Sequence, residues 1–157
     1  QMEKHSGEYG KLIGYFEEVF KLPWGKYSNN NWDLEFAQRV LNEKVFGLEE
    51  VKKRILETII VKKLGGHNKG FILMLYGAPG TGKTSIAKAI AESLDRPMKF
   101  ISFAGVSDST FIKGHKRTYV DSLPGVFIKE LMKSKVMNPI FVIDEIDKVS
   151  RNTFNFH

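Results

Sequence analysis

Residues 77–84 read GAPGTGKT, a run in which three glycines are followed by a lysine and a threonine. The run comes directly after FILMLY at 71–76, a continuous apolar segment of strand length. After it, Ile86, Ile90 and Leu94 recur at helical spacing. A strand that is buried on both faces reads as such an apolar run. The pattern therefore predicts a buried strand, a glycine-rich turn and a helix, which together indicate an α/β fold.

This spacing of glycine, lysine and threonine is suited to holding phosphate. Glycines let backbone N–H groups turn around phosphate oxygens where a Cβ would obstruct them, and the following helix directs its positive N-terminus at the same anion. Lys83 can reach the β- and γ-phosphates, and the Thr84 hydroxyl can bind Mg²⁺. The alternative is a glycine-rich turn with no ligand. The residues predicted to contact ATP are Gly77, Ala78, Pro79, Gly80, Thr81, Gly82, Lys83, Thr84 and Ser85.

Two carboxylates follow a second apolar run, IFVID at 140–144. At the carboxyl end of a buried strand, Asp144 can hold Mg²⁺ and contribute to the cofactor site. Glu145 can act as general base on an attacking water, with Lys83 as the second catalytic residue. The alternative for both carboxylates is a helix cap. The sequence thus predicts an ATP- and Mg²⁺-dependent hydrolase.

The remaining segments extend this α/β pattern. A further strand is predicted at 99–103, a polar stretch at 104–125 and a helix from Val126. Before the glycine run, three segments have helical spacing: 12–20, a short helix capped by Asp33, and a longer one from Leu48 to Gly65-Gly66. Lys26 to Asn31 reads as a linker.

Composition excludes several classes of protein. The chain has no cysteine, which rules out a disulfide scaffold, a thiol nucleophile and a cysteine-ligated zinc. Its net charge of +6 is spread without a basic block, so nucleic acid is not the partner we expect. No apolar run approaches the roughly 20 residues of a membrane helix, and no membrane association is expected. Because the first residue is Gln1, we expect a fragment.

Beyond the two nucleotide motifs, the chain resembles the ATPase portion of the Lon proteases, a branch of the AAA+ superfamily. Four segments carry the resemblance: LPWG at 22–25, FGLEEVKKRILE at 46–57, GHKRTYVDSLPG at 114–125 and NPIFVIDEIDK at 138–148. It implies a P-loop NTPase (AAA+) parallel sheet flanked by helices, with strands 1–3 of five present, preceded by a helical segment. The implied division is 1–25, the end of an N-terminal helical region, 26–150, the first part of the ATPase domain, and a non-family tail at 151–157.

The resemblance also implies roles for residues outside the two motifs. Phe46 and Gly47 would contact adenine, and Tyr119 and Val120 would form a pore loop that pulls unfolded polypeptide through a homohexameric ring. The implied function is the ATP-driven motor of a serine protease that degrades misfolded proteins. We expect this chain alone to be inactive, because much of the ATPase domain and the whole protease domain are absent.

Two other functions stay open. One is an AAA+ clamp or helicase loader acting on nucleic acid, and the other is an inactive truncated remnant. The expected location is intracellular, in the bacterial cytoplasm or, in a eukaryote, in the mitochondrial matrix or peroxisome.

Overall fold

The computed structural model describes residues 7–65, 70–115 and 123–149 of the 157-residue chain. The chain forms two compact units. One comprises residues 28–98, and the other comprises residues 1–27 together with 99–157.

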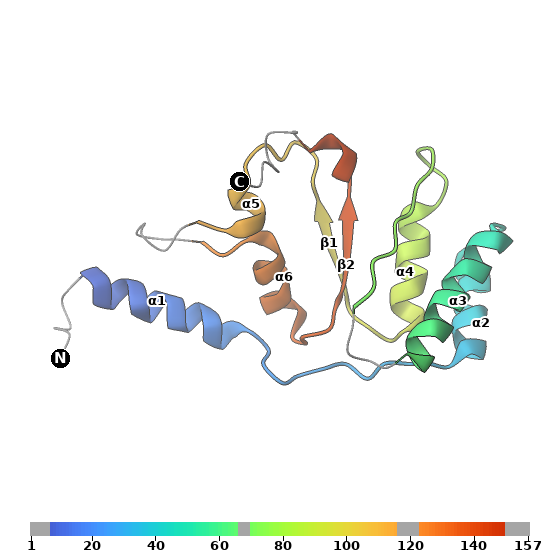
Figure 1. Ribbon diagram of the computed structural model, residues 1–157, viewed down its shortest axis with the longest axis horizontal. Helices are drawn as coiled ribbons and strands as arrows, with labels where there is room; N and C mark the ends of the chain where they lie inside the picture. Colours follow the sequence, from blue (N-terminus) through green and yellow to red (C-terminus); the bar gives the residue numbers. More distant parts are fainter. Residues whose placement is uncertain (1–6, 66–69, 116–122, 150–157) are drawn as a thin grey trace. The chain divides into compact units, whose positions relative to one another are not determined.

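The unit 28–98 is built from three helices: α2 (Leu34–Lys44), α3 (Glu49–Leu64) and α4 (Lys83–Ser93). Helix α2 packs against both α3 and α4 (Figure 1). The contacts are made by apolar side chains recurring at three- and four-residue spacing, as the sequence predicted. The core of the unit 28–98 consists of Ala37, Val40, Leu41, Val45, Ile55, Ile59, Ile86, Ala87, Ala89, Ile90, Ala91 and Leu94.

The start of α2 is fixed by local hydrogen bonds. Asp33 is the N-cap, and its Oδ1 accepts from the backbone N–H groups of Glu35 at 3.0 Å and Phe36 at 3.3 Å, which confirms the predicted cap. The preceding linker is irregular, and the Asn31 N–H donates to the Leu94 carbonyl oxygen at 3.1 Å. The linker is therefore tied to the end of α4.

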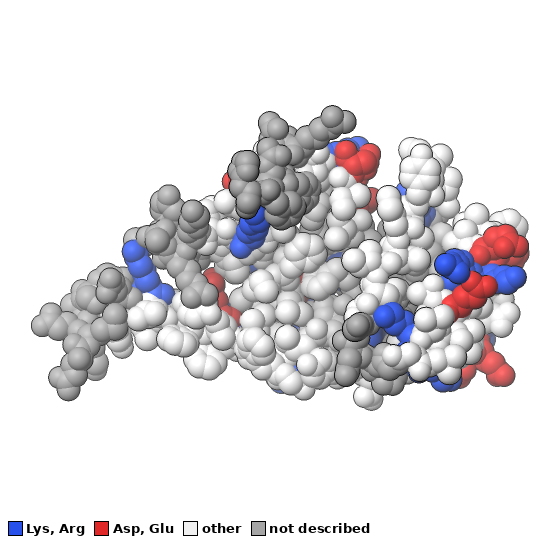
Figure 2. All heavy atoms as spheres, viewed as in Figure 1, with Lys and Arg blue, Asp and Glu red and all other residues white. Residues whose placement is uncertain are grey.

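Helix α3 departs from the predicted apolar face at two positions. Leu48, expected on that face, precedes the helix with a left-handed backbone (φ 58°) and is exposed. Lys52 is buried instead, and its ammonium lies 3.0 Å from the Glu49 carboxylate. The Glu49 carboxylate offsets the free-energy cost of burying the Lys52 charge. The spacing of apolar residues could not predict this burial. Charges of both signs alternate over α2 and α3 (Figure 2).

The strand predicted at 71–76 is not formed. Within the described residues the sheet contains other segments only, and 71–76 carries no strand assignment. Burial alternates along it: Ile72, Met74 and Tyr76 are 99%, 77% and 95% exposed, while Phe71, Leu73 and Leu75 are half-buried. The expectation of burial on both faces was wrong, because an apolar run becomes a strand only when a neighbouring strand pairs with it.

The other unit contains the two-stranded sheet. Strands β1 (Met98–Ser102) and β2 (Ile140–Asp144) run parallel, and β1 begins at the boundary between the units. The helices of this unit are α1 (Gly7–Lys21), α5 (Thr110–Lys113), α6 (Val126–Ser134) and the 3₁₀ helix η1 (Ile146–Lys148). Parallel strands joined through helices confirm the α/β class. The four-residue α5 lies in the polar stretch 104–125, for which the sequence analysis predicted no helix.

Phenylalanines join the elements of this unit. Phe103, buried just after β1, makes edge-to-face contacts with Phe111 of α5 at 5.8 Å and Phe127 of α6 at 6.4 Å between ring centroids. Phe127 makes the same contact with Phe141 of β2 at 5.4 Å. Such pairs add directional contacts to the burial of apolar area. The ends of β1 and β2 are thereby fixed against α5 and α6.

None of the helices in the described part of the chain is both long and apolar enough to cross a membrane.

Candidate nucleotide site

The glycine run forms a turn that leads directly into α4. Gly80 (φ 77°) and Gly82 (φ 85°) both adopt left-handed backbone conformations, which residues with a Cβ rarely take. Gly82 is also the N-cap residue of α4. These two positions favour glycine, and the loop leads into the N-terminus of a helix, as the sequence predicted.

Lys83 folds back across this loop. Its Nζ donates to the carbonyl oxygens of Gly77 at 2.9 Å and Ala78 at 2.7 Å. The Thr81 hydroxyl donates to the same Ala78 oxygen at 2.8 Å. Neutral acceptors at the start of the loop therefore hold the ammonium, and phosphate oxygens could replace them with stronger, charged acceptors.

The first turn of α4 has the features of an anion site. No side chain caps the helix, and no acidic residue lies in its first turn. Thr84 and Ser85 are exposed, and their backbone N–H groups belong to the first turn, where helical N–H groups lack intrahelical partners. The positive N-terminal end of α4 and the Lys83 ammonium both attract negative charge. The residues present therefore fit a polyphosphate.

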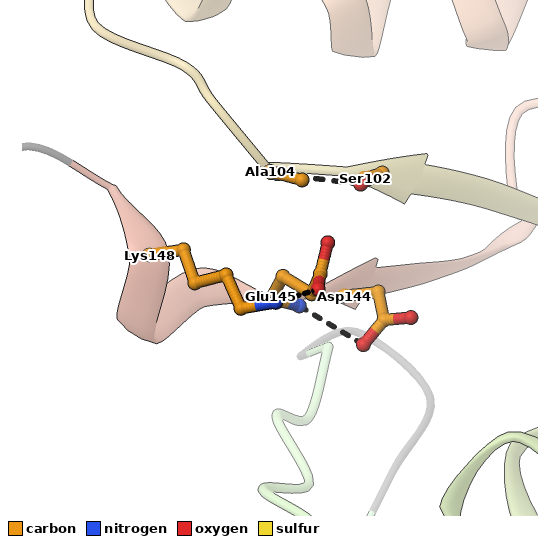
Figure 3. Close-up of polar contacts among 5 residues, drawn as sticks. All are labelled: Ser102, Ala104, Asp144, Glu145 and Lys148. Atoms are coloured by element: carbon orange, nitrogen blue, oxygen red, sulfur yellow. Dashed lines mark hydrogen bonds and ion pairs between the residues drawn. The ribbon is translucent and has the colours of Figure 1, made fainter. Parts of the chain in front are cut away.

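The acidic pair lies at the carboxyl end of β2 (Figure 3). Asp144 ends the strand, and its Oδ1 accepts from the Glu145 backbone N–H at 2.9 Å. Glu145 has a left-handed backbone (φ 57°), so the chain turns sharply into η1. Both residues are half-buried. Glu145 occupies the N-cap position of η1, as the alternative interpretation expected, but its side chain makes no capping hydrogen bond.

Glu145 is held by a lysine three residues later. The Lys148 ammonium forms an ion pair with Glu145 Oε1, drawn as a dashed line in Figure 3. This hydrogen bond and the charge of Glu145 raise the pKa of Lys148 above its ordinary value. The sequence analysis did not predict this contact. Its signal is the Glu-Ile-Asp-Lys spacing, which aligns positions 145 and 148 on a 3₁₀ turn.

Of the other predicted residues, the structure describes Phe46 and Gly47 but not Tyr119 and Val120. Phe46 is fully exposed, and Gly47 has a positive φ of 64°. Gly47 itself is half-buried. Tyr119 and Val120 lie outside the described residues.

The predicted residues are divided between the two units. The glycine loop, with Lys83 and Thr84, belongs to the unit 28–98, as do Phe46 and Gly47. Asp144 and Glu145 belong to the other unit. Within the described ranges no group of three or more His, Asp or Glu side chains could hold a metal by itself. A Mg²⁺ ion would need phosphate oxygens and water among its ligands.

The glycine loop and the acidic pair fall within one family match. Residues 73–156 match the model of the ATPase family associated with various cellular activities (AAA). This match covers more than half of the chain and includes both motifs in order. The chain belongs to the AAA family.

Known AAA proteins similar to this chain are Lon proteases. The chain is 49% identical over 150 residues to the mitochondrial Lon protease homolog of Homo sapiens, and 46% identical over 149 residues to the Lon protease of Finegoldia magna. These alignments cover 96% and 95% of this chain but 16% and 19% of the relatives. The chain therefore corresponds to part of the ATPase portion of those proteins, and the resemblance to Lon proteases seen in the sequence is confirmed.

Proposed function

We propose that this chain is the ATP-binding and ATP-hydrolysing part of a Lon-type, ATP-dependent serine protease. The observation that carries the proposal is the loop 77–82. The Lys83 ammonium bonds to its first two carbonyl oxygens, and the left-handed Gly80 and Gly82 lead into the uncapped start of α4. The Lon relatives, which align over 95% or more of this chain, support the assignment to a protease motor rather than to a clamp or helicase loader.

Nucleotide binding is assigned to three groups in the unit 28–98. The backbone N–H groups of 80–85 donate to phosphate oxygens, and Lys83 exchanges its contacts with Gly77 and Ala78 for phosphate oxygens. The Thr84 hydroxyl contributes to a Mg²⁺ site. Phe46 and Gly47 receive the adenine, chiefly through the backbone, as the resemblance implies.

Hydrolysis is assigned to the acidic pair at the end of β2. Glu145 accepts a proton from the attacking water as the water oxygen bonds to the γ-phosphorus and the bond to the ADP oxygen breaks. ADP leaves with the electrons of that bond, and Glu145 returns the proton to solvent. Asp144 is assigned as a Mg²⁺ ligand, as the sequence predicts. When bound, the ion neutralises charge on the phosphates.

We assign the free energy released by ATP hydrolysis to the movement of unfolded polypeptide through a pore. Tyr119 and Val120 form the pore loop of a homohexamer, where an aromatic ring and a branched aliphatic side chain grip unfolded protein without reading its sequence. The proposed compartment is the cytoplasm in a bacterium and the mitochondrial matrix or peroxisome in a eukaryote. The relatives include bacterial and mitochondrial proteins.

The test compares two stimulants of ATP turnover by the complete gene product that contains these residues. Casein, an unfolded protein, should raise the rate several-fold, whereas duplex DNA should leave it unchanged. Stimulation by DNA and not by casein would overturn the protease-motor proposal in favour of a clamp or helicase loader. No turnover under either condition would identify an inactive remnant.

A further inference from the structure

The backbone of Glu145 adopts a left-handed conformation that the residue would not prefer by itself. A left-handed conformation is unfavourable for a residue with a Cβ, by roughly 1 kcal/mol. Its φ of 57° therefore depends on contacts that hold the turn in place.

Lys148 supplies two of these contacts. Its backbone N–H donates to the Glu145 carbonyl oxygen at 3.0 Å, which closes the 3₁₀ turn. Its ammonium pairs with Oε1 of the same glutamate. Main chain and side chain of Glu145 are thus both held by one residue, and the Asp144 carboxylate holds the Glu145 N–H from the other side at 2.9 Å (Figure 3).

The pair is not a generic surface ion pair. The Glu145 side chain is 33% exposed, so it is partly screened from water, whereas the Lys148 side chain is 58% exposed and enters from the solvent side. The pair uses Oε1, which leaves Oε2 as the oxygen for the attacking water. Glu130 and Lys133 of α6 have the same three-residue spacing, with 2.7 Å between Nζ and Oε1, but lie on a regular helix away from the acidic pair.

We propose that Lys148 is a positioning residue for ATP hydrolysis, which fixes the carboxylate of Glu145 so that Oε2 meets the attacking water. The inference rests on the proposed function. Because Lys148 acts through Glu145 and the water, it should affect turnover and leave nucleotide binding unchanged. Misplacing a reacting group by about 1 Å can reduce a rate by up to about a hundredfold.

The test uses Lys148→Met and Lys148→Arg in the complete gene product, with Lys133→Met as the matched control. For Lys148→Met we expect kcat to fall about tenfold, with the KM for ATP and the Kd for a fluorescent ADP analogue within twofold of wild type. Lys148→Arg should restore most of kcat, because a guanidinium can make the same pair. Lys133→Met removes an ion pair of equal spacing and should leave kcat unchanged.

Three results would overturn the inference while leaving the proposed function standing: unchanged or increased kcat in Lys148→Met, a parallel loss of nucleotide affinity, or no recovery with arginine. Unaltered binding of the ADP analogue reports on the unit 28–98, and a denaturant midpoint equal to that of wild type reports on the unit that contains Lys148. With both unchanged, a loss of kcat alone cannot come from misfolding. A wild-type protein that binds nucleotide without hydrolysing it would overturn the proposed function and this inference together.

Discussion

The backbone N–H of Phe103 donates to the carbonyl oxygen of Asp144 at 2.9 Å. This bond continues the β1–β2 pairing past the end of β1 to the last residue of β2. Phe103 is buried against the rings of Phe111 and Phe127, so its N–H is a fixed donor. The acidic pair therefore starts at a strand end that is hydrogen-bonded to the segment following β1, and the turn at Glu145 begins there.

Glu145→Gln should leave nucleotide bound but uncleaved. Glutamine keeps the shape of the side chain and one acceptor oxygen but cannot accept a proton from water, and such a loss reduces rates by roughly a hundredfold or more. The measurement is ATP turnover of the complete gene product beside titration with a fluorescent ATP analogue. Asp147→Asn is the control, since it neutralises an exposed carboxylate two residues away and should keep turnover within twofold. Turnover near wild type in Glu145→Gln would refute the assignment of the base.

Gly125→Ala should destabilise the unit that contains the sheet. A Cβ at this position would lie 1.9 Å from the Ile112 carbonyl oxygen, so the backbone itself must move. Forcing extra atoms into such a site costs about 1–3 kcal/mol, seen as a lower denaturant midpoint. Gly10→Ala is the control: nothing lies within 4 Å of a Cβ there, and alanine inside α1 should raise stability slightly. Equal midpoints for both variants would contradict the close approach of Gly125 and Ile112.

The exposed row along 71–76 should make this chain self-associate. Ile72 and Met74 are 99% and 77% exposed, and the backbone around them is unpaired within the described residues, which is a template for edge-to-edge pairing. Ile72→Lys with Met74→Lys should reduce association measured by light scattering across a concentration series. The control is Val61→Lys with Leu64→Lys, which changes apolar side chains of similar exposure on α3, where the helix pairs its own backbone. Equal effects of the two double variants would exclude a role for the unpaired backbone.

Asp108 should titrate below the ordinary range of an aspartate. The side-chain hydroxyl and then the backbone N–H of Thr110 donate to its carboxylate and hold the pKa of Asp108 down. Because the folded pKa is the lower one, its contribution to stability is present above the unfolded value of about 3.9 and is lost as pH falls through the folded value. Thr110→Val removes the hydroxyl but keeps the N–H, so the Asp108 midpoint in an NMR titration should rise partway toward the ordinary value. An unchanged midpoint would show that the hydroxyl is not the main cause.

Features that depend on short stretches of sequence could be predicted. The Asp33 cap, the helices α2, α4 and α6, and the glycine turn before Lys83 follow from spacing and from residues with special backbone preferences. The strand ends at Ser102 and Asp144 lie within one residue of the predicted ones.

Features that depend on a distant neighbour could not be predicted. The exposure of Ile72 is set by the lack of a pairing strand among the described residues, which its apolar sequence cannot reveal. Burial of Lys52 requires the Glu49 carboxylate at 3.0 Å. The Lys148 contact requires both the left-handed Glu145 backbone and the 3₁₀ turn, two conformations that residue types alone do not indicate.

The most direct test of the central claim is a binding titration of Lys83→Ala with a fluorescent ADP analogue. The ammonium lies over the loop at 2.9 Å from Gly77 and 2.7 Å from Ala78, and removing it deletes the cation that we assign to the phosphates. We predict that the complete gene product loses at least tenfold in affinity, since a charged hydrogen bond contributes about 1.5–3 kcal/mol. Lys88→Ala, an exposed lysine farther along α4, should bind as wild type does. Equal affinity of wild type and Lys83→Ala would contradict the assignment of this loop as the nucleotide site.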